Sequence, residues 1–105
     1  DTACRYDLPI IFIIFNNGGI GSGFDNKRDK KGEENVSALS HTAHYETMAE
    51  AFGGDGYFVE NADQFREALA EALSKNNTTV INVAIDPMAD RKKQEFAWNR
   101  RDKMD

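Results

Sequence analysis

Apolar residues occur along this chain in short blocks that predict strands and helices in alternation. The most uniform block is residues 9–15, PIIFIIF, in which β-branched and aromatic side chains follow one another without polar interruption. Such a run is typical of a strand covered on both faces, as in a parallel sheet. A buried helical segment is the competing interpretation, which the shortness of the run disfavours. Two further strands are expected at residues 56–60, GYFVE, and at residues 78–87, TTVINVAIDP.

Helical spacing of apolar residues is clearest at residues 61–77. There, apolar side chains recur at helical intervals behind Asn61, a candidate N-cap, and Lys75 lies near the C-terminus, where the helix dipole favours a cation. The apolar positions of this expected helix are Phe65, Ala68, Leu69, Ala72 and Leu73. Residues 1–7 are typical of the last turns of a helix, because Pro9 follows and helices tend to end before proline.

Another helix is expected over residues 40–54, SHTAHYETMAEAFGG. Its apolar face would consist of Ala43, Met48, Ala51 and Phe52. The two glycines at its end supply the usual stop signal of a helix. Strands that alternate with helices predict an α/β fold, here a parallel sheet flanked by helices.

The 105 residues are enough for one small domain, and their net charge of −5 disfavours binding to nucleic acid or to an anionic membrane. The longest apolar run is too short to span a bilayer. A single cysteine, Cys4, excludes an internal disulfide and fits a reducing compartment. We expect residues 1–87 to form the domain, with a charged loop at 26–38, and residues 88–105 to form a basic tail.

Two asparagines and four closely spaced glycines follow the first strand at residues 16–23, NNGGIGSG. In an open α/β sheet, ligands bind beyond the carboxyl ends of the strands, and this is such an end. Asparagine oxygens and backbone carbonyls suit a hard cation such as Mg²⁺. The Rossmann and P-loop motifs both fail, because Phe24 stands where they require glycine or lysine. A glycine-rich turn with an asparagine in the left-handed conformation explains the pattern about equally well.

Residues 4–20, CRYDLPIIFIIFNNGGI, resemble the second half of the cofactor motif in the thiamin diphosphate-binding domain of thiamin-dependent enzymes. Within these enzymes, the motif is most similar to that of 2-hydroxyacyl-CoA lyases and oxalyl-CoA decarboxylases. Residues 44–60, HYETMAEAFGGDGYFVE, and residues 91–101, RKKQEFAWNRR, resemble the lyases. The resemblance implies a partial thiamin diphosphate-binding fold with thiamin diphosphate and Mg²⁺ as cofactors.

The resemblance also implies roles for the loop residues. Asn17 Oδ1 and the Gly19 carbonyl are the expected Mg²⁺ ligands, and the expected cofactor-binding residues are Asn17, Gly18, Gly19, Ile20 and Gly21. Gly21 departs from the family pattern, in which an aromatic residue is usual at that position. The acidic metal ligand of the first half-motif has no counterpart in this chain. The glutamate that activates thiamin belongs to another domain, so we expect no catalytic residue here.

The resemblance implies that the whole enzyme is a carbon–carbon lyase of fatty acid α-oxidation, which cleaves a 2-hydroxyacyl-CoA to formyl-CoA and a shortened aldehyde. This chain alone is expected to be inactive. Oxalyl-CoA decarboxylase and a non-catalytic α/β binding module are the alternatives. Expected partners are an acyl-CoA, the remainder of the enzyme and a second subunit, as a homodimer or homotetramer. Arg100 and Arg101 are candidates for the coenzyme A phosphates, although a solvated tail fits equally well. The compartment is expected to be peroxisomal or cytoplasmic, and the final KMD is not an SKL-type address.

Three further groups of residues are candidates for chemistry. His41 and His44 are spaced i, i+3, but zinc needs three or four ligands, so exposed imidazoles at a helix start are the favoured interpretation. Cys4 is expected to be a packed small side chain and not a nucleophile. Phe96 and Trp98 are expected to pin the tail to the domain.

Overall fold

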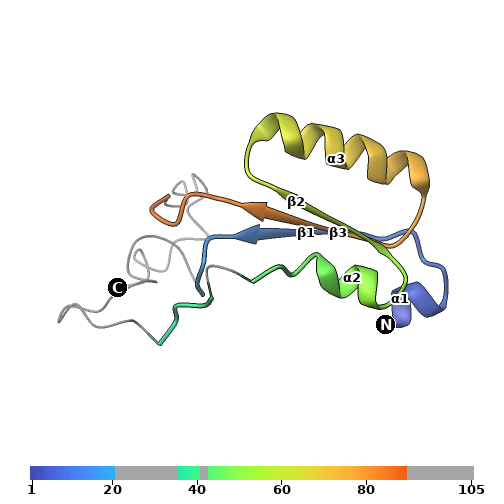
Figure 1. Cartoon of the computed structure of the whole chain (residues 1–105), viewed down its shortest axis with the longest axis horizontal. Coiled ribbons are helices and arrows are strands. Elements are labelled where there is room, and N and C mark those ends of the chain that lie inside the picture. The colour runs from blue at the N-terminus through green and yellow to red at the C-terminus, as the bar shows by residue number, and fades with distance from the viewer. Residues whose placement is uncertain (21–35, 41–42, 90–105) are drawn as a thin grey trace, which may run out of the picture.

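The computed structural model describes residues 1–20, 36–40 and 43–89 of the chain. Strands and helices alternate along it, which confirms the expected α/β fold (Figure 1). In chain order, the elements are α1 (Thr2–Arg5), β1 (Ile11–Asn16), α2 (Thr47–Ala51), β2 (Asp55–Val59), α3 (Ala62–Lys75) and β3 (Thr79–Ala84).

The three strands form one parallel sheet in the order β1-β3-β2, with α3 on one face and α2 on the other (Figure 1). Asn16 pairs with Ala84, and Val59 pairs with Val83, so the three strands end at the same edge of the sheet. The asparagine-glycine loop leaves β1 at this carboxyl edge, where open α/β sheets bind their ligands.

The hydrophobic core lies between the sheet and α3. Ile81 in β3 is fully buried and packs with Val59 of β2 and with Ala68 and Ala72 of α3. Because side chains alternate across a strand, the next residue, Asn82, points to the opposite face, on the side of α2. β3 therefore has buried side chains on both of its faces.

α3 forms as its local sequence signals predict. The Asn61 side chain accepts a hydrogen bond from the Gln64 backbone N–H at 2.8 Å, and the helix ends at Asn76 in the left-handed conformation, at φ 54°. Ala68 lies in the centre of the buried face, whereas Leu73, at the edge of the expected apolar face, is 66% exposed.

The prediction of a helix over residues 40–54 is wrong in its length, because α2 comprises only one turn of it. Residues 43–46 are not helical. Met48 and Phe52, two members of the expected apolar face, are exposed. Contacts from the sheet hold residues 43–46 in another conformation, as described below. The glycine stop is confirmed, with Gly53 at φ 93°.

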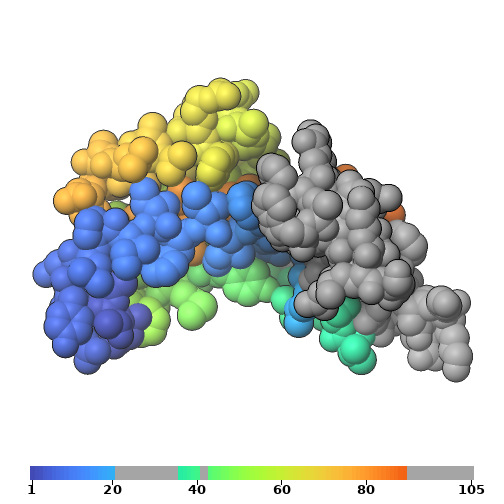
Figure 2. Space-filling view, turned by 180° about the vertical axis from the view of Figure 1, so that it is seen from behind, coloured from blue at the N-terminus to red at the C-terminus, as the bar shows by residue number. Residues whose placement is uncertain are grey.

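Among the described strands β1 lies at the edge of the sheet, and the exposure of its side chains corrects the expectation of a strand covered on both faces. Phe12, Ile13 and Phe15 are all exposed, Phe15 to 67%. Figure 2 shows β1 at the surface of the molecule, between α3 and α2. A uniformly apolar run indicates that both faces of a strand can be covered, but the strand order decides which strand has neighbours on both edges. In this sheet that strand is β3.

Some predictions concern residues that the structure does not describe. The residues concerned are Gly21, His41, Phe96, Trp98, Arg100 and Arg101, together with most of the charged loop. The division between a domain at 1–87 and a tail at 88–105 stays a prediction. Among the helices of the described residues, none is both long enough and apolar enough to cross a bilayer.

Candidate functional site

The loop that follows β1 is fixed by backbone hydrogen bonds from two other segments. The Ile85 N–H, just beyond β3, donates to the Asn16 carbonyl at 3.0 Å. The Leu39 N–H donates to the Gly18 carbonyl at 2.8 Å. The second bond belongs to an antiparallel bridge at Gly19 and joins the loop to a segment that lies far along the chain. The sequence pattern gives no sign of this contact.

Each asparagine of the loop also accepts a hydrogen bond from the backbone two residues on. The Gly18 N–H donates to Asn16 Oδ1 at 3.1 Å, and the Gly19 N–H donates to Asn17 Oδ1 at 3.2 Å. Gly18 is buried and has φ 79°, a conformation that favours glycine. The residue in the left-handed region is therefore a glycine, and the interpretation that places an asparagine there is wrong.

The loop presents two oxygen atoms that suit a hard cation. Asn17 Oδ1 accepts a hydrogen bond from the Gly19 N–H, and an amide oxygen has two lone pairs, so this bond alone does not exclude a metal ion. For the Gly19 carbonyl, no hydrogen bond is found within residues 1–20, 36–40 and 43–89. Amide and carbonyl oxygens are ordinary ligands of Mg²⁺. The described residues thus fit the expected ion as two of its ligands, while the same residues contain no group of three or more His, Cys, Asp or Glu placed to hold a metal.

Two hollows lie against the loop. One, of about 230 Å³, is lined by Asn17 and Gly19 together with Phe15, Leu39 and Tyr45. The other, of about 150 Å³, lies between the loop and the segment that follows β3. A larger and mostly apolar hollow, of about 490 Å³, lies away from the loop between α1, α2 and β1. We place the candidate site at the two smaller hollows because, of the three hollows formed by the described residues, these are the ones that Asn17 lines at the carboxyl ends of the strands.

Residues 1–83 match the sequence model of a family described as thiamine pyrophosphate enzyme, C-terminal TPP binding domain. The chain belongs to this family. Thiamine pyrophosphate is another name for thiamin diphosphate, so the match agrees with the family that residues 4–20 resemble. It also makes the three-stranded parallel sheet a part of a thiamin diphosphate-binding domain.

The relatives that this chain resembles belong to two kinds of enzyme, 2-hydroxyacyl-CoA lyases and oxalyl-CoA decarboxylases. Human 2-hydroxyacyl-CoA lyase 1 is 37% identical over 113 residues, which cover 99% of this chain. Oxalyl-CoA decarboxylase of Escherichia coli K12 is 42% identical over 89 residues, and 2-hydroxyacyl-CoA lyase of Arabidopsis thaliana is 38% identical over 99 residues; each covers 85% of this chain. The chain spans only 16 to 20% of the length of these three relatives.

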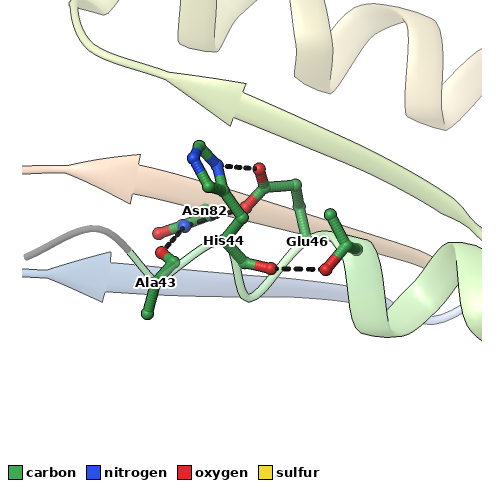
Figure 3. Close-up of polar contacts among 5 residues, drawn as sticks. Ala43, His44, Glu46 and Asn82 are labelled. Carbon is green, nitrogen blue, oxygen red and sulfur yellow. Dashed lines mark hydrogen bonds and ion pairs between the residues drawn. The ribbon is translucent and has the colours of Figure 1, made fainter. Parts of the chain in front are cut away.

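A buried polar cluster beside the loop of this thiamin diphosphate-binding domain was not predicted from the sequence. The Asn82 amide, at the centre of β3, donates to Glu46 Oε2 at 2.9 Å and to the Ala43 carbonyl at 3.4 Å. Glu46 Oε1 lies 2.8 Å from His44 Nδ1, and Thr47 Oγ1 donates to the His44 carbonyl at 2.7 Å (Figure 3). The two Asn82 bonds hold residues 43–46 against the sheet, and the other two bonds order residues 44–47 locally. These contacts explain why α2 starts so late.

Glu46 is a carboxylate in an unusual environment, since it is only 6% exposed. Burial by itself would raise the pKa of Glu46. The hydrogen bonds from Asn82, from its own backbone N–H and from His44, with the charge of His44, outweigh burial and lower the pKa below its usual value of 4.5. Glu46 is therefore ionised in the folded domain at neutral pH.

The remaining candidates of the sequence have ordinary surroundings. His44 contacts Glu46 and packs edge-on against the Phe58 ring, with the ring centroids 5.3 Å apart. Cys4 is a half-buried free thiol that lines the large apolar hollow. A sequence signal for the missed cluster does exist, because Asn82 interrupts an otherwise apolar strand and buried polar side chains need partners. Its partner Glu46 lies too far away in the chain to be identified from the pattern.

Proposed function

We propose that the chain is the C-terminal part of a thiamin diphosphate- and Mg²⁺-dependent 2-hydroxyacyl-CoA lyase. The whole enzyme would cleave the C1–C2 bond of a 2-hydroxyacyl-CoA to give formyl-CoA and a shortened aldehyde. The observation that supports the cofactor assignment is the position of the loop with Asn17 and Gly19 at the carboxyl ends of the strands. The observation that favours the lyase is the similarity to the human enzyme along 99% of this chain.

In this proposal the chain binds and orients the cofactor. Asn17 Oδ1 and the Gly19 carbonyl would hold Mg²⁺, and Gly18, Ile20 and Gly21 would lie next to the diphosphate. When bound, thiamin diphosphate supplies the electron sink for carbon–carbon cleavage. The bonds to Gly18 and Asn16 from distant segments fix the loop in advance, so less ordering is needed when the ligands bind.

The proposal assigns the remaining chemistry to other parts of the enzyme. Two neutral oxygens hold Mg²⁺ weakly against its own hydration, so an acidic ligand and the diphosphate must complete its coordination. The glutamate that activates thiamin would come from another domain, in a homodimer or homotetramer. Arg100 and Arg101 would contact the phosphates of the acyl-CoA. A peroxisomal or cytoplasmic location, and a place in fatty acid α-oxidation, belong to the same proposal.

Oxalyl-CoA decarboxylase is the second candidate, because the Escherichia coli enzyme has the higher identity, 42%. Both reactions give formyl-CoA, so the other product must be measured. The full-length protein, incubated separately with a 2-hydroxyacyl-CoA and with oxalyl-CoA, should release an aldehyde from the first and no CO₂ from the second. Release of CO₂ from oxalyl-CoA without aldehyde would establish the decarboxylase, and release of neither product would favour a non-catalytic module.

The cofactor role of Asn17 can be tested by binding alone. In the full-length protein, Asn17→Ala should weaken thiamin diphosphate binding at fixed Mg²⁺ by at least about tenfold, because Mg²⁺ requires near-octahedral oxygen coordination. Asn17→Asp keeps an oxygen at this position and should bind more tightly than Asn17→Ala. Isothermal titration calorimetry with Mg²⁺ and thiamin diphosphate gives both dissociation constants.

A matched control is Asn61→Ala, which removes the N-cap of α3 and lines neither of the two hollows beside the loop. It should lower the thermal midpoint while leaving the affinity for thiamin diphosphate unchanged. If Asn17→Ala binds the cofactor as tightly as the Asn61 variant does, Asn17 is not a metal ligand.

A further inference from the structure

One wall of the hollow beside the asparagine-glycine loop is formed by a residue that precedes a buried carboxylate, Glu46. Tyr45 lines this hollow together with Asn17 and Gly19. It lies between His44 and Glu46, the two residues whose side chains are joined at 2.8 Å. No side chain of the cluster around Glu46 lines the hollow, but Tyr45, the residue between His44 and Glu46 in the chain, does.

Both the backbone and the side chain of Glu46 are fixed by the sheet. A Cβ built on Gly56 of β2 would lie 2.3 Å from the Glu46 carbonyl oxygen, so the two backbones are in direct contact and only glycine fits. On the neighbouring strand, Asn82 donates to the Glu46 carboxylate. Glu46 therefore joins residues 43–46 to β2 and β3 at the same time. Because Tyr45 precedes Glu46 directly, its backbone has little freedom to move.

We propose that Glu46 is a positioning residue for the Asn17–Gly19 loop: through its bonds to His44 and Asn82 it fixes Tyr45 as the wall of the hollow, and on the proposed function this raises the affinity for Mg²⁺ and thiamin diphosphate. The reason for a carboxylate is the strength of the bonds. Hydrogen bonds to a charged acceptor are shorter and about twice as strong as neutral ones. A buried charge without partners would destabilise the fold, so the cluster works only as a complete set.

The orientation of Asn82 supports this role. Its Oδ1 is buried and has no hydrogen-bond partner among the residues that the structure describes, whereas its amide group makes two bonds to residues 43–46. Leaving a buried carbonyl oxygen unpaired is costly. The Asn82 amide N–H groups thus bond to residues 43–46, while its carbonyl oxygen stays unpaired among the described residues. This orientation is expected if the role of Asn82 is to hold residues 43–46.

A swap of the two side-chain chemistries tests the proposal in the full-length protein. Asn82→Asp places a second carboxylate against Glu46 and should weaken thiamin diphosphate binding, at saturating Mg²⁺, by about tenfold. Glu46→Gln removes the charge but keeps the shape and should weaken binding by about threefold. The double variant restores a donor–acceptor pair in reverse order, so its affinity should return to within about threefold of the wild type.

Thr78→Val is the matched control, because Thr78 is equally buried and also ties a distant segment, donating to the Leu8 carbonyl at the opposite edge of the sheet. It should lower the thermal midpoint without changing the dissociation constant. If the Glu46 and Asn82 variants behave like Thr78→Val, or if the swap does not recover affinity, Glu46 has only a structural role and the proposal is overturned, while the proposed function stands. If the wild type does not bind thiamin diphosphate, both are overturned. Should Asn82→Asp not fold, Glu46→Gln and the double variant decide.

Discussion

β1 and β3 are neighbouring strands of equal length that pair from Ile11 with Thr79 to Asn16 with Ala84. Their burial is opposite to their hydropathy. β1 is the more apolar strand, yet Phe15 is 67% exposed, whereas β3 contains Asn82, a polar residue that is fully buried. β3 lies between two strands and two helices, and β1 has a strand on one edge only.

The comparison shows that strand order, and not local hydropathy, decides where the core of this sheet lies. A central strand can contain polar residues if their partners come from elsewhere in the fold, as Glu46 does for Asn82. An edge strand can be wholly apolar and still be exposed. Substitutions in the two strands therefore test whether strand order decides where the core lies.

The largest effect is expected at the paired residues Ile81 and Ile13. Ile81→Asp places an unpaired carboxylate in the fully buried core and should destabilise the 105-residue chain by about 4 kcal/mol or more, enough to prevent folding. Ile13→Asp lies on the exposed strand and should cost about 1–2 kcal/mol. Soluble yield and circular dichroism measure both. Loss of folding in the Ile13 variant alone would show that β1 is the strand on which the core depends.

A medium effect is expected from the buried polar pair of β3, and it should depend on pH. The pKa of Glu46 is lowered in the folded state, so its contribution to stability is present above its unfolded value and is lost as the pH falls through the folded pKa. Asn82→Leu removes the hydrogen bond to this charge, a loss of about 1–3 kcal/mol at neutral pH. Thermal midpoints of the chain, measured from neutral to acid pH, should converge as the pH falls below 4.5. A constant difference across this range contradicts the assignment.

The smallest effect on stability, and a clear effect on association, is expected at Phe15. Phe15→Ser should change the stability of the chain by less than about 0.5 kcal/mol, because the side chain is already exposed. It should reduce self-association of residues 1–105, since an apolar edge strand offers unpaired backbone groups to another copy. Leu73→Ser is the matched control, because Leu73 is 66% exposed but lies on α3, which has no free edge. Light scattering that falls equally in both variants would indicate general hydrophobicity instead of the strand edge.

The sequence predicts those parts of the molecule whose causes are local. α3 was predicted close to its observed bounds, because Asn61 caps it and its apolar residues recur within the helix itself. The position of the asparagine-glycine loop at a strand end follows from an equally local pattern. The short α2 could not be predicted, because residues 43–46 are held by Asn82 and Gly56, which lie in two later strands.

The candidate site divides in the same way. Asn17 and Gly19 were identified from the resemblance of their loop to thiamin-dependent enzymes, and the structure places both in one turn at the expected end of the sheet. Whether they bind Mg²⁺ stays a prediction. The Leu39 contact and the wall formed by Tyr45 were missed, because each depends on a segment that returns to the loop after a long excursion.

The strand order also affects how the domain is made on the ribosome. The central strand, β3, is the last of the three to be synthesised, so the two outer strands emerge before the strand that joins them exists. The roughly sixty residues between β1 and β3 take on the order of 3–12 s to translate at ~5–20 residues per second. During that interval β1 is an apolar segment without its neighbour β3, and a chaperone that binds extended apolar chains has time to hold it before the two strands pair.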